Sequence, residues 1–150
     1  MSIVNNTYVK SIREIQEEIV SEFEVYDDWM DKYNYLIELS RDLPIIDPKQ
    51  KVNDNVIRGC QSKVWLNADY QNGIIHFTAD SDAIITKGIV SLLIRVLTDR
   101  TPDEILNADL VFIDQIGLRQ NLSPTRSNGL LSMIKQMKLY ALAYKTKYEK

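Results

Sequence analysis

The chain has 150 residues, of which 45% are apolar, and a formal net charge of −3. This length and composition can bury the core of one globular domain, so we expect a single domain over residues 1–150. The acidic balance argues against nucleic-acid binding, and no apolar run approaches the roughly eighteen residues of a membrane span.

Two helices are predicted in the first third of the chain. Apolar residues recur at helical spacing from Tyr8 to Phe23. Asp27 and Asp28 then stand where a second helix begins, because their charge is favourable at its N-terminus. The apolar face of this helix continues from residue 29 until Leu43-Pro44, and an irregular polar segment follows to about residue 56.

A β-hairpin and a buried helix are predicted in the middle. Strands at 63–67 and 74–79 are separated by a segment ending in Asn72-Gly73, a strong turn signal. Asp80, Ser81 and Asp82 then offer caps for the next helix. That helix is apolar nearly all round from residue 84 to 96, which indicates a central position.

The last third is predicted to be helical. Thr101-Pro-Asp-Glu104 has capping-box spacing with proline at the first helical position. A brief apolar stretch at 110–116 ends at Gly117. Ser123-Pro124 then opens a long amphipathic helix that runs to the C-terminus. The whole pattern indicates an α+β fold, rich in helix, with a small antiparallel sheet.

Cys60 is the only cysteine, so it cannot form an intramolecular disulfide or supply a multi-thiolate metal site. Gly59 favours a tight turn before it, and polar neighbours follow it. We therefore expect an accessible sulfur that acts as a nucleophile or carrier, against the alternative of a buried structural cysteine. Arg58 is expected to stabilise its thiolate. An unpaired cysteine without a visible export signal fits the cytoplasm.

Other candidate residues are weaker. A thiol hydrolase would need His76, the only histidine, but no orienting partner is visible in its strand. One Cys and one His do not make a metal-ligand set, and no Gly-rich phosphate loop is present, so no metal or cofactor is predicted. Arg126 lies in the first turn of a predicted helix, where its charge opposes the dipole. It is therefore either an anion or partner ligand or a solvated side chain.

Five blocks of sequence, taken together, resemble the SufE family of cysteine-desulfuration proteins. They lie in the family's order over roughly residues 28 to 140. The blocks are Tyr33-Asn-Tyr-Leu-Ile-Glu-Leu39 with Leu43-Pro44, Gly59-Cys-Gln-Ser-Lys-Val-Trp65, Asp80-Ser-Asp-Ala-Ile-Ile-Thr-Lys-Gly88, Arg100-Thr-Pro-Asp-Glu-Ile-Leu106 and Leu122-Ser-Pro-Thr-Arg-Ser-Asn-Gly129.

The resemblance implies an IscU-like fold and a sulfur acceptor that works with a pyridoxal-phosphate-dependent cysteine desulfurase of the SufS or CsdA type. Cys60 would take the sulfur as a persulfide, stimulate the desulfurase and deliver the sulfur to an Fe–S scaffold. The resemblance associates Arg126 and Asp82 with the desulfurase interaction, and Gly59 and Gln61 with the shape of the Cys60 loop. It leaves open whether such a carrier counts as an enzyme. A monomer is the default for a small carrier.

Three positions depart from the family pattern. Asn121 stands where many relatives have histidine, Thr125 replaces a common serine, and Arg58 replaces proline or a neutral polar residue. These differences concern the choice of partner rather than the sulfur chemistry. The main alternative function is a non-catalytic adaptor of a desulfurase in which Cys60 is incidental. Residues 1–20 have no functional assignment.

Overall fold

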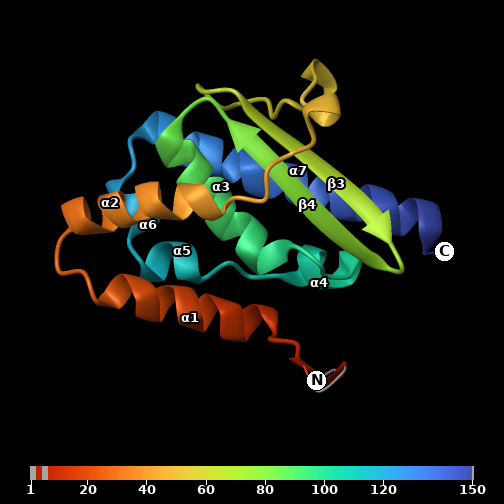
Figure 1. Ribbon diagram of the computed structural model, residues 1–150, viewed down its shortest axis with the longest axis horizontal. Coiled ribbons are helices and arrows are strands. Elements are labelled where there is room, and N and C mark those ends of the chain that lie inside the picture. The colour runs from red at the N-terminus through yellow and green to blue at the C-terminus, as the bar shows by residue number, and fades with distance from the viewer. Residues whose placement is uncertain (1–2, 5–6, 150) are drawn as a thin grey trace.

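The structure is a computed structural model that describes residues 3–4 and 7–149, with side chains from residue 9 onward. Figure 1 shows its elements in chain order. These are β1 (Ile3–Val4), β2 (Thr7–Tyr8), α1 (Ile12–Glu24), α2 (Trp29–Leu39), β3 (Val64–Gln71), β4 (Ile74–Ser81), α3 (Ile84–Leu97), α4 (Pro102–Asn107), α5 (Phe112–Gln115), α6 (Leu118–Asn121) and α7 (Pro124–Tyr148), with short 3₁₀ turns at Ser40–Asp42, Pro48–Gln50 and Asn53–Asn55. The predicted α+β class, with its antiparallel hairpin and long C-terminal helix, is confirmed.

The first helix begins later than predicted. Tyr8 belongs to β2, which pairs antiparallel with β1, and α1 starts at Ile12. The reason is a capping box: the Ser11 side chain accepts from the Glu14 backbone N–H, and the Glu14 side chain accepts from the Ser11 N–H. The second helix starts as expected, with Asp28 as its N-cap.

The β3–β4 hairpin is longer than the predicted strands. It pairs from Val64↔Ser81 to Gln71↔Ile74, so both strands continue to a two-residue turn. Asn72 and Gly73 have φ values of 54° and 82° at this turn, the left-handed conformation that tight hairpin turns require. Alternate side chains of each strand are buried in the core, and the side chains between them are more exposed. The strands can therefore include polar residues near the turn.

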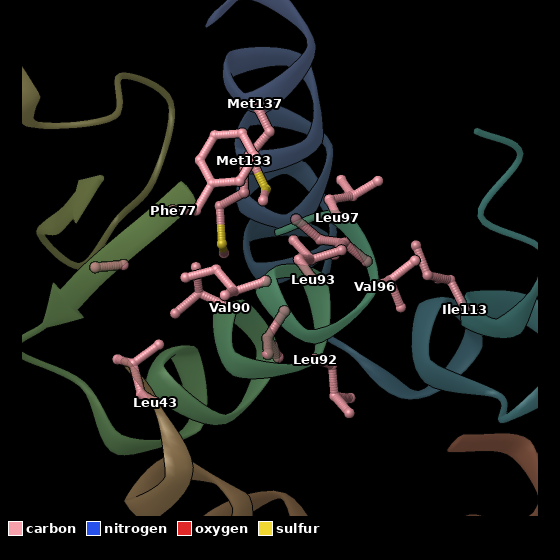
Figure 2. Close-up of a cluster of buried hydrophobic side chains, with 14 of the residues drawn as sticks. Leu43, Phe77, Val90, Leu92, Leu93, Val96, Leu97, Ile113, Met133 and Met137 are labelled. Atoms are coloured by element: carbon pink, nitrogen blue, oxygen red, sulfur yellow. The ribbon is translucent and has the colours of Figure 1, made fainter. Parts of the chain in front are cut away.

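Helix α3 forms the centre of the fold. Every residue of it except Ile84, Lys87 and Arg95 is buried, and it contacts α1, α2, β4 and α7. Figure 2 shows side chains of α3, β4 and α7 meeting in this core, with Phe77 and Met137 both fully buried. The central position predicted from its apolar sequence is confirmed.

The predicted side-chain cap of α3 is wrong. Its N-cap is Ala83, and no side-chain hydrogen bond caps it. Asp80 instead pairs with Lys51 at 2.9 Å and Lys87 at 3.2 Å, and Asp82 binds the Lys63 backbone. These acidic residues therefore join α3 to the hairpin and to the segment before it.

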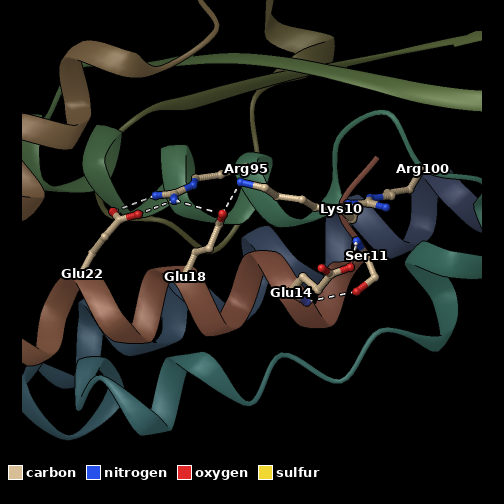
Figure 3. Close-up of polar contacts among 7 residues, drawn as sticks. All are labelled: Lys10, Ser11, Glu14, Glu18, Glu22, Arg95 and Arg100. Carbon is tan, nitrogen blue, oxygen red and sulfur yellow. Dashed lines mark hydrogen bonds and ion pairs between the residues drawn. The ribbon is translucent and has the colours of Figure 1, made fainter. Parts of the chain in front are cut away.

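Ion pairs connect helix α1 to helix α3. The guanidinium of Arg95 bonds both carboxylate oxygens of Glu22, at 2.9 Å for the Nη1–Oε1 pair, and lies 4.0 Å from Glu18 (Figure 3). Tyr35 of α2 donates its hydroxyl to the same Glu22 at 2.5 Å. Bidentate contact with Arg95 is the main reason that the pKa of Glu22 is lowered.

The capping predictions for the last third are confirmed. Thr101 and Glu104 form the capping box of α4, and Gly117 adopts φ +79° after α5. Ser123 caps α7 through the Arg126 backbone N–H, at 3.2 Å. The short helix α6 was not predicted. Among the described residues, no helix has the length and apolar character needed to cross a membrane.

Candidate functional site

Cys60 lies on a loop whose two ends are fixed to the hairpin. The Ile57 N–H donates to the Val64 carbonyl at 2.8 Å, where the loop begins. At the other end, the Lys63 backbone N–H donates to Asp82 Oδ1 at 3.0 Å, and the Ser81 hydroxyl donates to the Lys63 carbonyl at 2.8 Å. The stem is therefore held by hydrogen bonds, and the tip carries the sulfur.

The tip of the loop rests on α7. Gly59 has φ +93°, and a Cβ built on it would lie 2.4 Å from Ser132 Oγ. The Cys60 thiol donates to the Gly129 carbonyl across 3.6 Å. Glycine at position 59 is thus required both by the backbone conformation and by the close approach to α7.

A small cavity of about 80 Å³ lies beside the sulfur. It is bounded by the Cys60 loop, the first half of α3 and the first turns of α7. The lining residues are Cys60, Gln61, Ser62, Thr86, Ile89, Thr125, Arg126, Gly129 and Met133. A water occupies about 30 Å³ of liquid, so there is room for an added sulfur atom.

Cys60 is half-buried rather than freely exposed. Burial raises the pKa of its thiol, because a thiolate loses hydration in the cavity. The expectation that Arg58 activates the thiolate is wrong for this conformation: the Arg58 side chain is exposed, and desolvation alone determines the shift in the Cys60 pKa. The resting sulfur is a neutral thiol near pH 7.

Arg126 lies at the rim of the same cavity. Its Nη1 donates to the Tyr33 hydroxyl of α2, and its Cζ lies 5.8 Å from the centre of the Tyr33 ring. The ring of Trp29 meets Tyr33 edge-on at 6.5 Å. Contact with Tyr33 therefore directs the Arg126 side chain toward α2, while the residue stays exposed to solvent.

The other predicted site residues take different places. Gln61 lines the cavity, whereas Gly59 shapes the loop from outside it. Asp82 is exposed and does not line the cavity, but its bond to Lys63 fixes the end of the loop. Of the three departures from the family pattern, Thr125 lines the cavity, and Asn121 donates to the Gly117 carbonyl at 2.8 Å.

His76 is not near the sulfur. It lies five residues along β4 from Ser81, which pairs with Val64 at the Cys60 end of the hairpin, so the separation along the strand is roughly 16 Å. It does have the orienting partner that the sequence did not reveal, since its Nδ1 is 2.7 Å from Asp99 Oδ1. A base at this position cannot serve Cys60 in this conformation.

Several residues of the cavity were not predicted as site residues. Ile89 was assigned only to the apolar face of its helix, and Thr86 and Met133 had no role assigned from the residues themselves. Tyr33, which does not line the cavity but supports Arg126, was assigned to an apolar helix face and to a block of the family resemblance. Gly129 did carry a signal, because a glycine inside an amphipathic helix marks a close approach of another backbone or a ligand. The contacts between distant segments that form this site could not be predicted from the spacing of residues along the chain.

A larger groove elsewhere does not compete with this site. It has a volume of about 630 Å³ and runs along α1, where it is lined by Lys10, Glu14, Glu17, Glu18, Ser21, Glu22 and Arg95. Its two cations pair with Glu18 and Glu22, so they hold the fold together (Figure 3). Among the described residues, no group of three or more His, Cys, Asp or Glu side chains could hold a metal ion.

Comparison with known proteins supports the family resemblance. The SufE family model, described as an Fe-S metabolism associated domain, matches residues 17–141. An uncharacterized SufE-like protein of Rhizobium etli is 39% identical over 127 residues, which cover 81% of this chain and 86% of that protein. One from Rhizobium meliloti is 35% identical over 127 residues, covering 81% and 91%.

Two further matches extend this comparison. SufE-like protein 1, chloroplastic/mitochondrial, of Arabidopsis thaliana is 38% identical over 135 residues, covering 89% of this chain but 36% of the plant protein. The solution structure of a hypothetical protein from Thermus thermophilus has the same fold, with a TM-score of 0.72 and 19% identity, and the match covers 88% of this chain and 96% of that one. The chain belongs to the SufE family, whose domain is associated with Fe–S metabolism.

Proposed function

We propose that this protein accepts sulfur from a pyridoxal-phosphate-dependent cysteine desulfurase of the SufS or CsdA type. Cys60 carries that sulfur as a persulfide toward an Fe–S assembly scaffold. The observation that carries this proposal is the position of the only cysteine, on a loop with fixed ends, beside a cavity with room for an added sulfur atom. A reducing compartment such as the cytoplasm would maintain this unpaired thiol.

The transfer is a thiol–persulfide exchange. The Cys60 thiolate attacks the outer sulfur of the desulfurase persulfide, a new S–S bond forms, and the S–S bond of the desulfurase breaks. The desulfurase cysteine leaves as a thiolate with the electron pair of the broken bond. The reaction neither consumes nor produces net electrons, so it needs no metal or redox cofactor.

The half-buried thiol must be exposed before it reacts. Its hydrogen bond to Gly129 and its raised pKa hold it neutral, and neutral thiols are poor nucleophiles. We infer that the desulfurase lifts the loop tip from α7 while the stem stays fixed. Gly59 and Gln61 would permit that movement. Arg126, which lines the cavity, and Asp82, which holds the end of the loop, would contact the partner.

The partial burial of Cys60 also favours the alternative function, a non-catalytic adaptor of a desulfurase. If the loop stayed closed, the protein would stimulate a desulfurase by contact alone, and Cys60 would only help to pack the loop on α7. The two functions differ in what happens when the sulfur is replaced by oxygen.

The experiment that separates them is desulfurase turnover with cysteine and saturating amounts of this protein. We expect Cys60→Ser to abolish the stimulation, because the hydroxyl cannot accept sulfur, while it still competes with the wild-type protein for the desulfurase. His76→Ala is the matched control and should stimulate fully, since it removes only the surface pair with Asp99. Full stimulation by Cys60→Ser would establish the adaptor role instead.

A further inference from the structure

The cavity beside Cys60 has one charged side chain. Among the described residues that line it, Arg126 alone is ionic, and the others are neutral. Three ionisable residues near the loop do not line the cavity: Arg58 and Asp82 are exposed, and Lys63 binds Asp82 at the stem through its backbone N–H. A charge that developed inside the cavity would therefore face Arg126.

Arg126 is positioned by a second element. Tyr33 of α2 accepts a hydrogen bond from its Nη1 and places an aromatic ring 5.8 Å from its Cζ. Tyr33 is only partly exposed, and its own ring packs against Trp29. An arginine is a flexible side chain, and contact with both the hydroxyl and the ring limits it to one part of the rim.

The resting thiol does not explain this arrangement. The sulfur of Cys60 donates to the Gly129 carbonyl oxygen, and burial raises the pKa of its thiol, so the resting site holds no anion that would pair with the guanidinium. A second sulfur, bonded about 2.05 Å from Sγ, has room in the same cavity, which Arg126 also lines. A charge on that second sulfur would share the cavity with this guanidinium.

We propose that Arg126 is the counter-ion of the outer sulfur of the Cys60 persulfide, and that Tyr33 is the positioning residue that holds it there. This inference rests on the proposed persulfide function. After transfer, the hydropersulfide Cys60–S–SH loses its proton to solvent, and the resulting Cys60–S–S⁻ lies beside the guanidinium. The ion pair keeps the terminal sulfur anionic and sheltered until an acceptor arrives.

The test is the pH profile of persulfide alkylation, followed by intact mass. Reduced protein is loaded on Cys60 with inorganic polysulfide, so that loading does not depend on a desulfurase. We expect Arg126→Gln to move the midpoint for alkylation of the persulfide upward by about one pH unit, the effect of removing one nearby opposite charge. Tyr33→Phe, which keeps the ring and loses the hydroxyl, should produce a smaller shift in the same direction.

Two controls make the result specific. Arg58→Gln removes an exposed arginine of the same loop and should leave the midpoint unchanged, and Arg126→Lys should restore most of the shift because it restores the charge. Equal midpoints in the wild type and Arg126→Gln, at equal thermal stability, would overturn the inference, as would an equal shift in Arg58→Gln. If polysulfide loads Cys60 but no desulfurase does, the proposed function fails while the ion-pair test still gives its own answer.

Discussion

Cys60 is a thiol whose environment opposes ionisation. It is half-buried against α7, and its hydrogen bond runs to a carbonyl oxygen, an acceptor that stabilises S–H rather than S⁻. The sequence predicted that this residue lies on a turn, and its role as the reactive atom stays a prediction. It could not show that Cys60 is half-buried, because the sulfur contacts Gly129, which lies about seventy residues later in the chain.

The raised pKa predicts a pH profile for the resting protein. We expect iodoacetamide to alkylate folded Cys60 with a midpoint above that of the same cysteine in urea, where the thiol titrates near its ordinary value of about 8.5. A raised folded-state pKa stabilises the fold below the unfolded-state value, and this stabilisation is lost as pH rises through the folded-state pKa. A folded midpoint at or below the unfolded one would contradict the sheltered neutral thiol.

At the scale of elements, local signals predicted most helix ends and the hairpin turn. These signals act within a few residues, so they could be predicted without knowledge of tertiary contacts. They are Thr101-Pro102, Ser123-Pro124 and Asn72-Gly73. The acidic run before α3 led to a wrong cap prediction, because Asp80 and Asp82 find partners in Lys51 and Lys63 from other segments. Contacts between segments override local preference there.

The packing of α2 on α3 depends on a helical glycine. A Cβ on Gly88 would lie 2.3 Å from the Leu36 carbonyl oxygen, so Gly88→Ala must push two backbones apart. We expect this overpacking, of about 1–3 kcal/mol, to outweigh the gain of up to about 1 kcal/mol in helix propensity. The melting temperature should fall by several degrees.

Gly129→Ala is the matched control for that variant. It makes the same chemical change in α7, but the nearest atom to the new Cβ is Cys60 Sγ at 3.5 Å, an ordinary contact. Its melting temperature should equal or exceed that of the wild type, as measured by circular dichroism. A Gly88→Ala protein as stable as Gly129→Ala would show that α2 and α3 are not packed backbone to backbone.

The whole molecule brings the sulfur site together from four separate parts of the chain. The loop supplies Cys60 and Gln61, α3 supplies Thr86 and Ile89, α7 supplies Arg126, and α2 supplies Tyr33. The five sequence blocks that resemble the SufE family include most of these residues, and the family is confirmed over residues 17–141. The order of the motifs therefore predicted the family, whereas the cavity beside Cys60 and the support of Arg126 by Tyr33 became visible only in the fold.

The most direct test of the persulfide carrier is the intact mass of this protein after incubation with a cysteine desulfurase and cysteine, without reductant. We predict a gain of about one sulfur atom, some 32 Da, that is lost on thiol treatment and absent in Cys60→Ser. No gain with desulfurases of either the SufS or the CsdA type, while Cys60 can still be alkylated in urea, would contradict the carrier function.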